Sequence, residues 1–153
     1  MMQQRLSLPK IAPNAYKALG GVETYLRACG LEPRLIQLVK MRASQINGCA
    51  YCLDMHSREA RHVGETEQRL YLLDAWQESS LYSERERAAL AWTEALTRIA
   101  ETHAPDETYE ALLAHFNEKE IVDLTVLVGQ INLWNRVAIS LRNQHSTESS
   151  KAA

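Results

Sequence analysis

The stretch from residue 121 to residue 142 limits most strongly what this chain can fold into. Drawn as a helix, it carries apolar side chains around most of its circumference, more than one core-facing stripe requires. Asn117 and Glu120 precede it with the spacing of a helix-capping pair. The pattern predicts a long helix that is buried on several sides. Any apolar face left over is expected to contact a second copy of the chain.

The rest of the chain also has helical spacing of its apolar residues, and no segment alternates as a strand does. We therefore expect an all-α fold of about seven helices in one compact domain over residues 1–142, followed by a polar, disordered tail over 143–153. Gly, Pro and Asn-Gly breaks, with a capping box that starts at Ser83, predict six helices before the long one, over 14–29, 33–46, 49–64, 65–77, 83–103 and 105–116.

Charge and hydropathy exclude several classes of function. The formal net charge is -2, and Lys and Arg are scattered among Asp and Glu, which argues against nucleic-acid binding. The N-terminal stretch lacks the apolar core of a signal peptide, and the longest apolar-rich run, over 124–135, is too short to span a bilayer. We expect a cytoplasmic protein that binds neither membrane nor nucleic acid.

Two of the three cysteines form the motif Cys49-Ala-Tyr-Cys52. In a reducing compartment this motif indicates redox chemistry or metal binding. The Asn47-Gly48 break places both cysteines in the first turn of a helix, where unpaired N–H groups and the helix dipole favour a thiolate. The pair is therefore the candidate working group.

His56 follows Cys52 by four residues, which puts its imidazole on the same helix face, within reach of that sulfur. There it can act as a cation or as a proton shuttle. This spacing favours Cys52 as the attacking thiolate and Cys49 as the residue that resolves its sulfenic acid. The reverse assignment remains open at this stage.

The other Cys, His and Trp residues suggest no further site. His62 is six positions after His56 and is expected to face elsewhere, so structural zinc is disfavoured and no metal is predicted. Cys29 lies on an apolar helix face and is expected to be buried. Packing in the core is expected for Trp76, Trp92 and Trp134, and a solvated or capping position for His103 and His115.

The run over 35–56, which contains Cys49, Cys52 and His56, resembles the carboxymuconolactone decarboxylase superfamily in its alkylhydroperoxidase AhpD branch. The stretches 121–125 and 131–136 resemble the final helix of that family. The resemblance implies a homotrimer or homohexamer and a hydroperoxidase in which Cys52 reduces the hydroperoxide and Cys49 resolves it. It also implies no bound cofactor, and an external dithiol donor such as a lipoyl or thioredoxin-like protein.

Two positions depart from the family pattern. Gln37 stands where the family has its proton-relay glutamate, and Tyr51 stands where the best-studied members have a histidine. Glutamine exchanges no proton at neutral pH, and a tyrosine with a pKa near 10 is a poor base. The relay cannot operate unchanged, so a dithiol–disulfide reductase or a redox sensor with little turnover is the alternative. A decarboxylase ranks below both, because the decarboxylases of the family lack the C-x-x-C pair.

Overall fold

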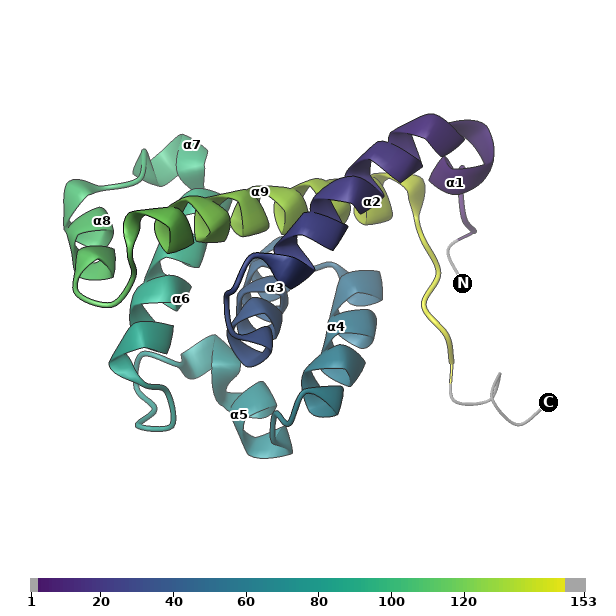
Figure 1. Cartoon of the computed structure of the whole chain (residues 1–153). Helices are drawn as coiled ribbons and strands as arrows, with labels where there is room; N and C mark the ends of the chain where they lie inside the picture. The colour runs from purple at the N-terminus through teal and green to yellow at the C-terminus, as the bar shows by residue number, and fades with distance from the viewer. Residues whose placement is uncertain (1–2, 148–153) are drawn as a thin grey trace.

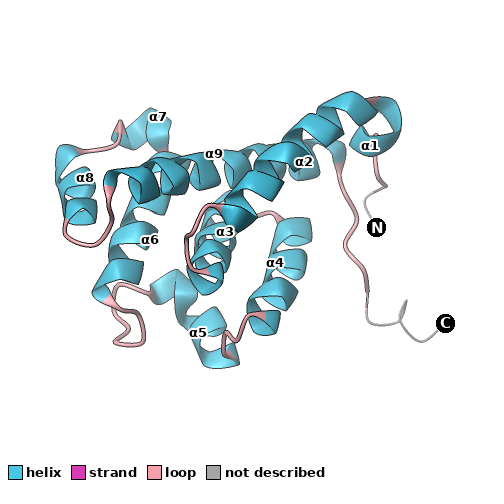
Figure 2. Cartoon of the chain, viewed as in Figure 1, coloured by secondary structure: helices cyan, strands magenta, loops and turns pink. Residues whose placement is uncertain are grey.

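A computed structural model describes residues 3–147, and within them the chain is all helical, with no strand (Figures 1 and 2). This confirms the predicted fold class. The described residues form α1 (Leu8–Ile11), α2 (Pro13–Ala28), α3 (Pro33–Asn47), α4 (Ala50–His62), α5 (Glu67–Leu72), the 3-10 turn η1 (Leu73–Ala75), α6 (Glu84–Thr97), α7 (Ile99–Thr102), α8 (Asp106–Leu113) and α9 (Glu118–Leu141).

Helix α9 crosses the molecule, and α2, α3, α4 and α6 pack against it (Figure 1). Leu124, Leu127 and Val128 of α9 are buried in one apolar cluster with residues of α3 and α6, which confirms the predicted long, buried helix. Three apolar side chains of α9 remain exposed, and contact between copies of the chain stays a prediction for them: Val122, Val126 and Ile139.

Several predicted helices are shorter in the structure, among them α4, which spans Ala50–His62 within the predicted 49–64. The helix predicted over 65–77 begins at Glu67, because the Thr66 side chain accepts the Arg69 N–H as its N-cap, and it passes into η1 after Leu72. Glu65 is therefore free to turn its carboxylate toward Arg69. The helix predicted over 105–116 ends at Leu113.

The remaining differences add short helices at element ends. The helix predicted over 83–103 breaks at Arg98, whose φ of -106° and ψ of 35° are not helical, and restarts as α7. A four-residue α1 precedes α2, with Pro9 in its first turn. α2 itself starts at Pro13, one residue before the predicted cap.

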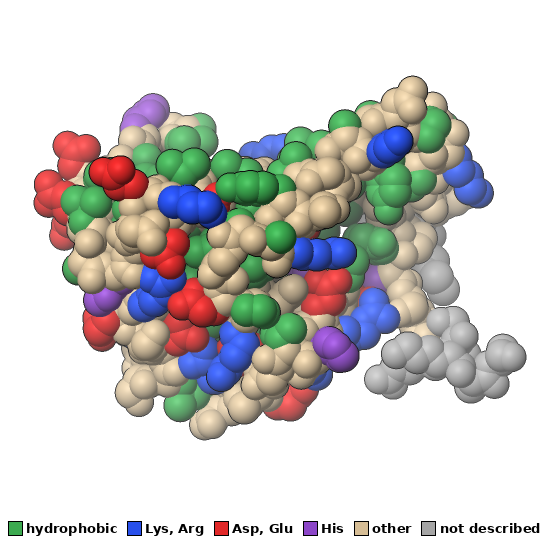
Figure 3. Space-filling view, viewed as in Figure 1, with side chains coloured by type: hydrophobic (Ala, Val, Ile, Leu, Met, Phe, Trp, Pro, Cys, Tyr) green, Lys and Arg blue, Asp and Glu red, His purple; other side chains and the backbone are tan. Residues whose placement is uncertain are grey.

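Arg142 adopts a left-handed conformation that ends α9, and residues 143–147 form no helix. The predicted disordered tail from residue 148 onward lies outside the described residues. Acidic and basic side chains lie next to one another over much of the face in Figure 3. Over residues 3–147, no helix is both long and apolar enough to cross a membrane.

Candidate functional site

The turn between α3 and α4 places the cysteine pair. Gly48 has a φ of 67°, in the left-handed region that favours glycine, and its N–H donates to carbonyls of the last turn of α3. The Cys49 N–H then donates to the Ser44 carbonyl at 3.0 Å. The predicted break at Asn47-Gly48 is confirmed, and it directs Cys49 to the N-cap position of α4.

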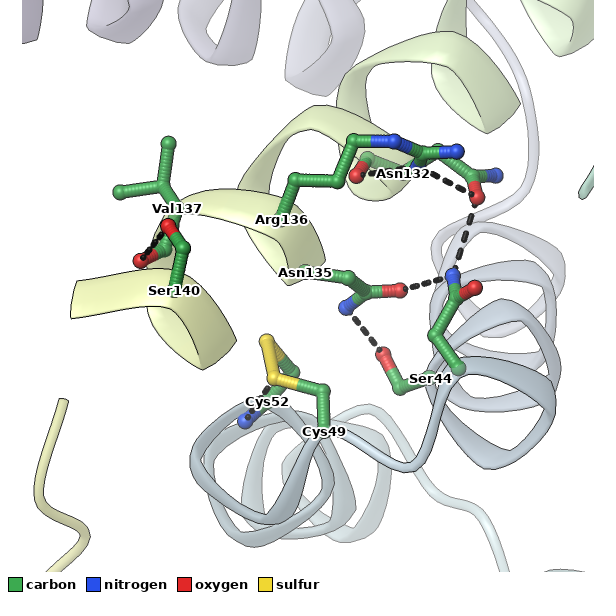
Figure 4. The surroundings of a disulfide bond; sticks show 9 residues. Ser44, Cys49, Cys52, Asn132, Asn135, Arg136, Val137 and Ser140 are labelled. Carbon is green, nitrogen blue, oxygen red and sulfur yellow. Dashed lines mark hydrogen bonds between the residues drawn. A yellow bond between two sulfur atoms is a disulfide. The ribbon is translucent and has the colours of Figure 1, made fainter. Parts of the chain in front are cut away.

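Cys49 and Cys52 are joined by a disulfide, with their Cα atoms 5.3 Å apart (Figure 4). The Cys52 N–H donates to Cys49 Sγ at 3.3 Å, so a sulfur fills the N-cap role. The predicted placement of the pair at a helix N-terminus is confirmed. Once the disulfide is reduced, the positive end of the helix dipole favours a thiolate in this first turn.

A cavity of about 840 Å³ has Cys52 on its wall, together with His56, Gln37 and Tyr51. Cys49 does not line it and packs against Ala138 of α9. Four of the five residues predicted for the site thus share one cavity, with Cys49 bonded behind them. Both cysteines are only 1% exposed, so the cavity is the approach to the Cys52 sulfur.

His56 is buried and has an acidic partner that the sequence analysis missed. Its Nδ1 lies 3.0 Å from Glu59 Oε2, one turn further along α4. The hydrogen bond with His56 holds the pKa of the Glu59 carboxyl below its usual value, against the opposing effect of burial, and the Lys40 charge and the Gln37 side chain add to it. The i, i+3 spacing on a helix was the signal for this pair.

A second carboxylate, Glu23, holds α2 against the other walls of the cavity. Its Oε2 lies 2.7 Å from Lys40 Nζ of α3, and its Oε1 accepts from Trp134 Nε1 of α9 at 2.9 Å. Tyr16 of α2 packs edge-on against the Trp134 ring, with centroids 6.1 Å apart. All four residues line the cavity, so Trp134 is a wall residue in addition to its expected packing role.

Behind the disulfide, a buried amide network joins the end of α3 to α9 (Figure 4). Asn135 is completely buried, donates to Ser44 Oγ at 3.0 Å and accepts from Asn47 Nδ2 at 2.8 Å. Asn47 Nδ2 also donates to Asn132 Oδ1 at 2.9 Å. The network fixes the residues that immediately precede Cys49.

Replacing Asn135 by Ala is expected to lower the free energy of unfolding by about 2 to 3 kcal/mol, because Ser44 and Asn47 would each lose a buried partner. Urea unfolding followed by circular dichroism measures the change. Asn14→Ala, at an exposed position of α2, is the control and is expected to stay within about 0.5 kcal/mol of wild type. Equal effects of the two substitutions would contradict a stabilising role of the network.

The positions of two side chains differ from those that the sequence predicted. His62 was expected to face away from His56, but it borders the same wide cavity from an exposed position at the end of α4. Cys29 was expected to be buried; it is only partly so, and its Sγ donates to the Leu26 carbonyl. Within the described part of the chain, no group of three or more His, Cys, Asp or Glu side chains is placed to hold a metal ion.

His103 and His115 remain apart from the cavity lining. His103 is exposed in a left-handed conformation at the end of α7, in agreement with the expected capping or solvated position. His115 is partly buried in the turn after α8.

These features define an all-α protein with a dithiol pair at a helix N-terminus. The sequence pattern of the carboxymuconolactone decarboxylase family matches residues 12–95, and the chain belongs to that family. It is 42% identical over 147 residues to the uncharacterized protein YdfG of Bacillus subtilis. The aligned region covers 96% of this chain and all of YdfG.

Solved structures agree in fold. A protein of unknown function from Agrobacterium tumefaciens, described as a candidate antioxidant defence protein AhpD, is 51% identical and superimposes with a TM-score of 0.93 over 95% of this chain and all of its own. The debrominase Bmp8 is 22% identical, with a TM-score of 0.77 over 92% of this chain and 75% of its own. At that identity the second likeness concerns the fold alone.

Proposed function

We propose that the protein is a thiol-dependent hydroperoxidase that cycles between the Cys49/Cys52 dithiol and the disulfide. One observation carries the proposal: Cys52 lies on the cavity wall with His56, while its disulfide partner Cys49 lies behind it at the N-cap of α4. A substrate in the cavity therefore reaches Cys52 first. This favours Cys52 as the attacking residue over the reverse assignment.

The reaction balances with these residues. Cys52 passes its thiol proton to His56, and its thiolate attacks one oxygen of the hydroperoxide, so that the O–O bond breaks, the sulfur is oxidised to a sulfenic acid and the alkoxide takes the proton from His56. Cys49 then attacks that sulfur, forming the disulfide and releasing water. An external dithiol donor, of the lipoyl or thioredoxin type, reduces the disulfide to the two thiols, so no bound cofactor is required.

The walls of the cavity favour an organic hydroperoxide. Ile36, Met55 and Val137 present apolar surface to the cavity that Cys52 borders, and about 840 Å³ far exceeds the volume that hydrogen peroxide needs. Burying the hydrocarbon part of a substrate contributes about 0.8 kcal/mol per methylene group. We therefore expect kcat/KM for cumene hydroperoxide to exceed that for hydrogen peroxide by about tenfold or more.

The test is peroxide consumption by the reduced protein under excess dihydrolipoamide, with each of the two peroxides. A hydroperoxidase consumes many equivalents per chain, and Cys29→Ser, which removes the cysteine outside the pair, is expected to retain this activity. Equal rate constants for the two peroxides would overturn the assignment of the substrate class.

Gln37 supports one second candidate, a dithiol–disulfide reductase or redox sensor with little peroxide turnover. The family relay carboxylate is replaced there by an amide, whose buried Oε1 has no hydrogen-bond partner within residues 3–147. A sensor would consume one equivalent of peroxide per chain and then persist as the disulfide, even with the dithiol present. The same assay therefore separates the two candidates.

A further inference from the structure

Position 37 carries an amide, but another residue of the cavity supplies a carboxylate. Glu59 lies on α4 one turn beyond His56, and both line the cavity together with Gln37 and Cys52. The Glu59 carboxylate is 3.0 Å from His56 Nδ1, a direct hydrogen-bond distance. Gln37, on α3, lies near enough to contribute to the lowered pKa of the same carboxylate, and α3 packs against α4.

We propose that Glu59 is the relay carboxylate of this protein and that it positions His56 toward Cys52 in place of a carboxylate at residue 37. This deepens the proposed function and rests on it. The carboxylate that contacts His56 then comes from α4 and not from α3.

The hydrogen-bond geometry determines what Glu59 does. An ionised carboxylate only accepts, so His56 donates from Nδ1, and Nε2 is left to exchange a proton at Cys52 or at the departing alkoxide. Glu59 also stabilises the imidazolium that exists between those two transfers, in the way a third residue orients the base in other nucleophile–base pairs. It moves no electrons and does not touch the peroxide.

Gln37, on α3, interacts with the same carboxylate and adds slightly to the lowering of its pKa. Among residues 3–147, the buried Gln37 Oε1 has no hydrogen-bond partner, which is unfavourable for a buried acceptor. The Glu59 side chain is 41% exposed, so its contact with the buried His56 is the one that fixes the direction of the carboxylate.

Other charged and titratable groups also line the cavity, and the variants described below leave them unchanged. Lys40 lies near enough to lower the pKa of Glu59, and its own ion pair is with Glu23. Arg58, which also borders the cavity, is paired with Asp54. The remaining ones, on α2 and α4, are Tyr16, Arg27, Tyr51 and His62.

The experiment exchanges the acid and the amide. Glu59→Gln, which is isosteric, is expected to lower kcat/KM for cumene hydroperoxide by about 10- to 100-fold, because proton transfer through a positioned group contributes at least that much. Adding Gln37→Glu to that variant is expected to restore most of the rate. Asp54→Asn removes a carboxylate from the same helix without contact to His56 and is expected to keep the wild-type rate. Thermal melting checks that all variants are folded.

A second measurement does not depend on peroxide turnover. In the reduced Cys29→Ser background, the rate of Cys52 alkylation by iodoacetamide is followed against pH, and Glu59→Gln is expected to move the half-maximal rate to higher pH. An inactive wild type would defeat the proposed function, and this profile would still test Glu59. The inference is overturned if Glu59→Gln keeps more than half of the wild-type rate and its alkylation profile, or if the double variant is as slow as Glu59→Gln alone.

Discussion

Cys52→Ser is expected to abolish peroxide consumption, with a loss of at least about a thousandfold. A serine hydroxyl at neutral pH is not ionised and cannot be oxidised by a peroxide to a sulfenic acid, so neither the attack nor the later disulfide is available to it. The substitution is small and the site is buried, so the fold is expected to persist. Peroxide consumption under excess dithiol measures the loss.

Cys49→Ser is the matched comparison, because it removes the partner sulfur and leaves the cavity wall intact. It is expected to react once and stop as a Cys52 sulfenic acid or as a mixed disulfide with the reductant, which mass spectrometry identifies. If Cys49→Ser is the inert variant and Cys52→Ser is the one that traps an adduct, the roles are reversed. If neither substitution alters consumption, the disulfide is structural.

Glu65→Ala is expected to lower the free energy of unfolding by about 3 to 5 kcal/mol, the usual cost of removing one partner from a buried ion pair. The Glu65 side chain is fully buried and accepts two hydrogen bonds from Arg69, at 2.8 and 3.1 Å. Arg69 also pairs with Glu86 at the start of α6, so the cluster joins α5 to α6. Its loss would leave the Arg69 guanidinium with one carboxylate fewer.

The effect of pH on this cluster has a defined sign. Burial opposes ionisation of Glu65, but the hydrogen bonds and charges of Arg69 and Arg34 outweigh it and hold the pKa of the carboxyl below its usual value. Such a group stabilises the fold fully above its usual pKa and loses that contribution as the pH falls through its lowered value. The difference between wild type and Glu65→Ala is therefore expected to shrink in acid.

Glu67→Ala is the control for Glu65, two residues along the chain. Glu67 pairs with Arg61, and both side chains are more than 40% exposed, so its loss is expected to cost far less than the loss of Glu65. Urea unfolding at neutral and at acid pH measures both variants. A Glu65→Ala protein as stable as Glu67→Ala at neutral pH would show that the buried pair contributes no net stability.

Local sequence rules were sufficient for much of the fold and for the centre of the site. The capping boxes at Ser83 and Asn117, the left-handed Gly48 and the helix that begins at Cys49 all depend on residues within one or two turns of each other. The same holds for the i, i+4 step from Cys52 to His56. Errors arose at helix ends, as at Arg98 and Thr66, where side-chain and tertiary contacts compete with a few backbone hydrogen bonds.

Site residues contributed by distant parts of the chain had no local signal. Glu23 meets Trp134 across 111 residues, and Asn47 meets Asn132 across 85 residues. Local sequence patterns also do not show which of the two cysteines faces the cavity. The cavity exists only where α1, α2, α3, α4 and α9 converge.

The sequence by itself therefore determined the helices, the turn that presents the cysteine pair, and the family to which the chain belongs. The tertiary structure decided that Cys52 and not Cys49 lines the cavity, that the contact of Glu59 with His56 borders the same cavity, and that Glu23, Lys40 and Trp134 also line it. The physical reason is the separation in sequence between the residues that interact. Helix formation and capping are set by hydrogen bonds between near neighbours, whereas a cavity is the space left when distant apolar faces pack, and its shape follows from all of them together.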